Sequence, residues 1–424
     1  MGHLSNGTSW KVGHIFLPIN MPNNKDQHYV PKMLMKRFAD SNHLFSFVVR
    51  TEDKTRTITN NPYDNQCQYD YYYGRDKEWE HELGTIERKC SPIFDKIEND
   101  YNYYPSEEEI NVIKQFVMSQ HARTPRMIQW EKRNIKRAFV EQYRLYKRNT
   151  EGNAHLSQAE LKWIDDNKSD SFENQAKDIM RRISFETVKY ISDLELIIVH
   201  FDCKKNLILS DDPVVVINPF IHSAGFISIG LIMIIPISCK TLLVFRDPVL
   251  YENVDKIVYS SRDNAVNAIN RYQAITFDKR LMFYDNDGAE YVNGIIEATK
   301  ADRARFNKTG EGGVFPGIND VMIIQHHPTL STNYPFVFSN VKKEYRKFKY
   351  FDNMNYRFHS DRYLDRLYHG LPIFAQQPMS NIDLKKLPSY IDFTKQYWNL
   401  HKSFETVEID IDADKENENA DDDS

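Results

Sequence analysis

The feature that most constrains the fold is a change in the spacing of apolar residues near residue 186. Over residues 77–185, apolar residues recur every three or four positions, which is the period of one helical face. After residue 186, short runs rich in β-branched residues follow one another, from LELIIVHF to TLLVFRD, as expected for an antiparallel or mixed sheet. We therefore predict an α+β fold, with a mainly helical N-terminal half packed on that sheet and an additional C-terminal segment.

Composition along the chain predicts four segments. We expect an irregular lead-in over 1–24, an α+β domain over 25–285, an extension of unassigned class over 290–404 and a disordered acidic tail over 405–424. The tail carries ten acidic residues and one lysine, a composition that cannot bury a core. The 4 cysteines are scattered without a CxxC pair, which argues against a zinc ribbon and a disulfide framework and suits a reducing cytoplasm.

The most apolar stretch of the chain predicts strands and no membrane span. The run GFISIGLIMIIPISC at 225–239 is shorter than the roughly 20 residues of a membrane helix, and Pro236 interrupts it. The N-terminus shows no basic start followed by an apolar core, so we predict no signal peptide and a cytoplasmic location.

Two helix boundaries can be predicted from local signals. Ser106 precedes Glu109 by three residues, the spacing of a capping box at a helix start. Pro125 should kink or break the helix that begins after Ser106. Beyond it, residues 126–149 form a basic amphipathic helix, which either contacts a nucleic-acid backbone or presents an ordinary solvated face.

Four motifs occur in order along the chain. They are HYVPKMLMKRF (28–38), EHELGTIE (80–87), SQHARTPRM (119–127) and LILSDDPVVVINP (207–219). Together they resemble the DUF4238 family, with weaker matches continuing to about residue 285. This chain has Asp212 where the family usually has Asn. The resemblance implies that the motif positions are shared with a mostly microbial family. It implies no reaction, because the family has no assigned function.

The candidate site consists of polar residues at the ends or turns of apolar segments, where a rigid scaffold can direct them into a cleft. They are His28, Glu87, Gln120, Arg123, Ser210 and Asp211. His28 has the chemistry of a general acid or base. Glu87 or Asp211 would orient it or hold a divalent cation such as magnesium or manganese.

The remaining three residues have weaker or supporting roles in this hypothesis. Arg123 would grip a phosphate and Gln120 would orient the substrate. Ser210 is a candidate nucleophile, although it lacks the Gly-x-Ser-x-Gly setting of a nucleophile elbow.

Each candidate also has a structural interpretation. His28 would hydrogen-bond a buried carbonyl, Glu87 and Arg123 would form a buried ion pair, and the segment 210–213 would be a turn whose side chains bond its own backbone. The functional interpretation predicts a phosphodiester hydrolase, metal-assisted or not, of a nuclease-like defence or toxin type. The alternative is a non-catalytic module that binds nucleic acid or protein through the aromatic and basic stretch 342–370.

Overall fold

The computed structural model describes residues 26–307 and four short segments beyond them. The gaps within 26–307 are 43, 51–53, 75–77, 153–154, 220–222, 227, 229, 249 and 285–287, and the later segments are 313–316, 321–324, 327–328 and 340–343. The expected lead-in, the acidic tail and most of the C-terminal extension lie outside the described residues.

The first half of the described chain is dominated by four long helices. They are α2 (Glu78–Asn99), α3 (Glu107–Ala122), α4 (Pro125–Glu151) and α5 (Gln158–Glu186). The predicted capping box is confirmed, because the Ser106 hydroxyl accepts from the amide of Glu109 while the Glu109 carboxylate accepts from the amide of Ser106. Pro125 begins a new helix with Thr124 as its N-cap, so the predicted break between α3 and α4 is also confirmed.

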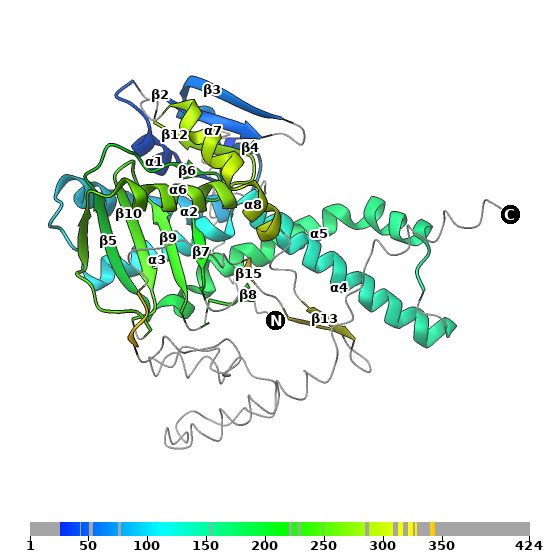
Figure 1. Ribbon diagram of the computed structural model, residues 1–424. Coiled ribbons are helices and arrows are strands. Elements are labelled where there is room, and N and C mark those ends of the chain that lie inside the picture. The colour runs from blue at the N-terminus through cyan, green and yellow to red at the C-terminus, as the bar shows by residue number, and fades with distance from the viewer. Residues whose placement is uncertain are drawn as a thin grey trace, which may run out of the picture.

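The larger sheet has five strands in the order β11 (Ile257–Ser260), β5 (Glu195–Phe201), β10 (Thr241–Arg246), β9 (Ile232–Pro236) and β7 (Val215–Ile217). Neighbours are antiparallel except β11, which runs parallel to β5, so the sheet is mixed. Every residue of β10 is buried, because helices cover both faces. The helix α6 (Asp263–Thr276) crosses one face and α3 lies behind the other (Figure 1).

The smaller sheet joins strands that are far apart in the sequence, in the order β3 (Thr55–Pro62), β2 (Leu44–Arg50), β12 (Arg280–Phe283) and β6 (Leu209–Ser210). Its apolar face packs against α7 (Ala289–Ala298), and α8 (Lys300–Asn307) follows. The fold is therefore α+β, as the change in spacing predicts.

The remaining elements are short. They are β1 (Asp26–His28) paired with β4 (Gln68–Asp70), α1 (Lys32–Met35), β8 (Ser223–Ala224) paired with β15 (His327–Pro328), the hairpin of β13 (Gly313–Pro316) and β14 (Val321–Ile324), and 3₁₀ turns at Lys36–Phe38, Tyr63–Asn65 and Val188–Ile191.

Local sequence is misleading at two places. The aromatic stretch CQYDYYYG has no clear strand pattern, but residues 68–70 form β4, because β1 supplies the backbone partner. The stretch from residue 259 has a helical pattern, but residues 257–260 form the edge strand β11 and α6 begins only at Asp263.

The apolar run 225–239 contains β9 and the turns around it. Within the part of the chain that the structure describes, no helix has the length and apolar character required to cross a membrane.

Replacing the N-cap of α3 tests the helix boundary. We expect Ser106→Ala to lower the free energy of unfolding by about 1 kcal/mol, because the amide of Glu109 loses its acceptor. Ser106→Asp retains an acceptor and should stay close to wild type. Urea denaturation of both variants measures the difference, and equal losses in both would contradict the capping role.

Candidate functional site

His28 lies at the end of β1, half-buried, with its imidazole fixed by one hydrogen bond. Its Nε2 is 2.9 Å from the carbonyl oxygen of Asp64. A carbonyl oxygen only accepts, so Nε2 must carry the proton in this contact, and Nδ1 of the neutral ring is left with a lone pair. The structural interpretation of His28 as a partner of a backbone carbonyl is thus observed, and the same bond leaves the other nitrogen available as a base.

The surroundings of His28 keep it neutral near pH 7. Burial lowers its pKa from 6.5, and the nearby Lys32 ammonium lowers it further. The bond to Asp64 and the charge of Glu87 act in the opposite direction without overcoming burial. A neutral imidazole with an unprotonated Nδ1 is the form that accepts a proton.

Glu87, Arg123 and Gln120 form a hydrogen-bonded chain beside this histidine. Arg123 donates from Nη1 to Glu87 Oε1 at 2.6 Å, and from Nε and Nη2 to Gln120 Oε1 at 2.9 and 2.5 Å. Gln120 in turn donates to the carbonyl of Tyr29 at 2.9 Å, which ties α3 to the segment that carries His28. The Arg123 side chain is 1% exposed and that of Glu87 26% exposed, so the carboxylate lies at the surface end of the chain.

Sequence reasoning missed three residues that support this arrangement. The Tyr73 hydroxyl donates to the carbonyl of His28 at 2.9 Å. Buried Gln27 accepts from the amide of Tyr73 at 2.6 Å and donates to Glu80 at 2.9 Å. The aromatic run 69–73 was visible in the sequence, but its role depends on the pairing of β1 with β4, which no local pattern indicates.

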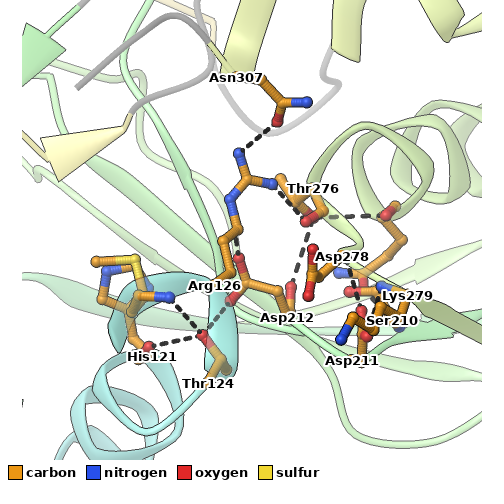
Figure 2. A network of polar contacts seen from close by, with 12 residues as sticks. His121, Thr124, Arg126, Ser210, Asp211, Asp212, Thr276, Asp278, Lys279 and Asn307 are labelled. Atoms are coloured by element: carbon orange, nitrogen blue, oxygen red, sulfur yellow. Dashed lines mark hydrogen bonds and ion pairs between the residues drawn. The ribbon is translucent and has the colours of Figure 1, made fainter. Parts of the chain in front are cut away.

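Ser210 and Asp211 are both buried and belong to a second group of polar residues (Figure 2). The Asp211 carboxylate accepts from the amides of Asp278, Lys279 and Arg280 at 2.8, 2.8 and 2.9 Å. The Ser210 hydroxyl donates to Gln273 at 2.7 Å. These contacts give both residues a structural role at the junction of β6 with β12.

Asp212 connects the same junction to the turn between α3 and α4 (Figure 2). Its carboxylate accepts from the Thr124 hydroxyl at 3.2 Å and lies 3.8 Å from Arg126 Nε. Burial raises the pKa of Asp212 to about 7, and Arg126 opposes this rise. Burial also raises the pKa of Asp211 to about 6, against the lowering effect of its three amide donors.

Tyr29 joins the two groups of predicted residues. Its backbone carbonyl accepts from Gln120, and its hydroxyl accepts from Arg280 Nη1 at 3.0 Å. The amide of the same Arg280 donates to Asp211. The structure therefore brings His28, Glu87, Gln120 and Arg123 together and places Ser210 and Asp211 in a neighbouring network that shares Tyr29.

The basic helix 126–149 corresponds to most of α4, which forms an antiparallel hairpin with α5 that extends from the sheets (Figure 1). Several of its cations pair with acidic residues. The pairs are Lys132 with Glu173, Lys136 with Asp165, Arg144 with Glu141 and Lys147 with Glu160. Much of this positive charge is thus offset within the hairpin.

A metal ion would need several donor side chains that face one point. In residues 26–307 and the short segments beyond, outside the gaps, no group of three or more His, Cys, Asp or Glu side chains is placed to hold a metal ion.

Comparison with known proteins identifies a family for this chain. The model of the family described as "Protein of unknown function (DUF4238)" matches residues 26–287, a range that contains every residue of the candidate site. No curated protein and no solved structure matches the chain.

Removing the charge of Asp211 tests the buried junction. We expect Asp211→Asn to lower the free energy of unfolding by roughly 3 kcal/mol, because an amide cannot satisfy three backbone donors. Asp202→Asn changes an exposed aspartate close in sequence and should have little effect. Thermal or urea unfolding measures both, and a neutral Asp211→Asn would refute the anchoring role.

The raised pKa of Asp212 predicts a pH-dependent stability. The folded-state pKa of about 7 lies above the ordinary 3.8, so the folded protein binds the proton more tightly than the unfolded chain. Relative to Asp212→Asn, wild type should therefore lose stability as pH rises from about 4 to about 7 and change little above that. Urea unfolding of both proteins across this range measures the difference, and a constant or rising difference would contradict the assignment.

Proposed function

The chain belongs to the DUF4238 family, and because that family is described only as being of unknown function, we propose a function from the site itself. It is the hydrolysis of phosphodiester bonds, with His28 as general base and Glu87 as its charged partner. The role would be that of a nuclease-like effector of defence or toxin type.

The protonation and hydrogen bonding of His28 are the main support for this proposal. Its Nε2 proton is engaged by the Asp64 carbonyl, and its lowered pKa keeps the ring neutral at physiological pH. Nδ1 is then the acceptor for the proton of an attacking hydroxyl or water. An orienting carbonyl on one nitrogen and a free lone pair on the other is the arrangement that a histidine base needs.

Glu87 supports the protonated form of this base. Its charge acts to raise the pKa of His28, so it favours the imidazolium that forms as the proton is transferred. Arg123 and Gln120 act through Glu87 and are positioning residues, since their hydrogen bonds are directed at each other, at Glu87 and at Tyr29.

A cation beside His28 would contact the phosphate. Lys32 lies close enough to lower the pKa of His28, and 52% of its side chain is exposed. It forms a long 3.6 Å pair with Asp64, which a phosphate oxygen can replace at little cost because both partners are exposed. In this proposal Ser210 and Asp211 hold the scaffold, His28 accepts the proton, and Glu87 stabilises the resulting imidazolium.

Substitution of His28 tests the reaction. Labelled single-stranded RNA and DNA are incubated with the protein, with and without magnesium or manganese. We expect cleavage by wild type and a loss of about 10²–10⁴-fold in His28→Gln, which keeps a donor for the Asp64 carbonyl but has no basic nitrogen. The wild-type rate should fall as pH drops below the lowered pKa of His28, because the protonated ring cannot act as a base.

Matched variants separate the outcomes. Glu87→Gln should reduce cleavage, whereas Glu82→Gln, on the same helix but paired with Arg181, should not. Equal cleavage by wild type and His28→Gln would remove the enzymatic proposal. Retained binding of RNA or DNA without any cleavage would favour the alternative, a non-catalytic binding module.

A further inference from the structure

Three arginines from separate elements meet where α6 ends and β12 begins. Arg50 ends β2, Arg126 lies in the first turn of α4 and Arg303 lies in α8. We call these three the arginine cluster. Each donates to a backbone carbonyl of the same short segment. The bonds are Arg303 to Ala274 at 2.6 Å, Arg126 to Thr276 at 2.6 Å, and Arg50 to Asp278 at 2.9 and 3.1 Å.

Aromatic rings fix the planes of these guanidinium groups. Arg303 lies 3.8 Å and Arg50 5.6 Å from the ring centre of Phe277, which is buried in the same segment. Arg126 lies 4.1 Å from the ring centre of Phe306. Carbonyl dipoles and ring faces each offset part of the positive charge, but neither supplies a full negative charge.

Carboxylates compensate the cluster only in part. Within the described part of the chain, Arg50 and Arg303 form no ion pair, and Arg126 has one long contact of 3.8 Å with Asp212. The charges of Asp278 and Asp211 also act on Arg126. Arg303 is 6% exposed, and its Nε has no hydrogen-bond partner among the residues that the structure describes. A buried guanidinium N–H without an acceptor is unfavourable.

The three charges also act on one another. Burial lowers the pKa of Arg303, and the charges of Arg50 and Arg126 lower it further, to about 9, while Asp211 and Glu297 act weakly in the opposite direction. Positive groups held this close, with one of them buried, would be stabilised by a nearby anion.

We propose that the arginine cluster is a phosphate-binding site that takes inorganic phosphate or the phosphate group of a nucleotide. Planar guanidinium groups match the oxygens of phosphate with paired N–H donors. Arg303 Nε and Arg50 Nη1 are not used by the contacts with the carbonyls. Arg50 is only half-buried, and the Arg126 side chain, which is 13% exposed, bonds exposed Asn307, so solvent reaches the edge of the cluster.

Calorimetric titration at low ionic strength tests the site without reference to cleavage. Inorganic phosphate and AMP are titrated into the full chain, with chloride at matched ionic strength as the blank. Thermal unfolding in the same solutions should show a midpoint that rises with phosphate concentration, because a ligand of the folded state stabilises it. Binding of phosphate alone identifies the free anion as ligand, and tighter binding of AMP identifies a nucleotide; both results support the site.

Variants locate the binding. Arg303→Met keeps an apolar stem over Phe277 and removes the charge, and we expect it to weaken phosphate binding at least about tenfold. Arg50→Met is a second, half-exposed variant in case Arg303→Met does not fold. Arg305→Met is the matched control, because Arg305 lies on the same helix with its side chain 78% exposed and pairs with Asp302.

Two results would overturn the proposal. One is a wild-type protein that responds to phosphate no more than to chloride. The other is equal phosphate affinity in wild type, Arg303→Met and Arg50→Met, which would place the anion elsewhere. Loss of cleavage in the His28 variants has no bearing on either result, so the two proposals fail independently.

Discussion

The rest of the structure depends on three hydrogen bonds that the Asp211 carboxylate accepts from backbone amides. A buried carboxylate needs such donors, because an unpaired charge in the interior is very unfavourable. Since Asp211 follows β6 and Arg280 begins β12, this contact closes the turn after α6 and sets the register of the smaller sheet, in which Leu281 faces Ser210. The carbonyls of the same turn then become the acceptors of the arginine cluster.

Amide side chains of α6 extend this support to the segment before Asp211. Asn270 bonds the amide of Ile208 and the carbonyl of Asn206, and Gln273 bonds the amide of Ser210 and the carbonyl of Pro213. These contacts replace the strand that would otherwise pair with this backbone. The helix therefore specifies the path of the chain through hydrogen bonds as well as through its apolar face.

The parts of the fold that sequence predicts are those set by local rules. The long helices follow from the 3.6-residue period, and their ends follow from Ser106 and Pro125. The pairing of β2 with β12 and of β1 with β4 depends on residues far apart in the chain, and no local period encodes it. The arginine cluster cannot be predicted from the sequence for the same reason, because its three arginines come from segments far apart in the chain.

The candidate site was foreseen to the extent that one residue conflicted with its surroundings. Glu87 interrupts the apolar face of α2, and an acid there requires a partner, which the structure supplies as Arg123 at 2.6 Å. Asp211 gave no comparable signal, because Ser and Asp in a turn usually bond nearby backbone. Asp211 instead accepts from the amides of residues 278–280. These lie in a turn that comes after strands β7 to β11 and helix α6 along the chain.

Atoms without a hydrogen-bond partner distinguish the residues proposed to bind substrate or anion from those that only hold the fold. The acceptors of Asp211, the hydroxyl of Ser210 and the amide of Gln120 are engaged by protein partners. His28 Nδ1 and Arg303 Nε keep a lone pair and a proton that the described residues do not use. An atom without a hydrogen-bond partner lowers the stability of the folded state. The loss is greater for a buried N–H than for a half-exposed nitrogen that water can reach. A hydrogen-bonding partner would therefore stabilise the buried Arg303 more than the half-exposed His28.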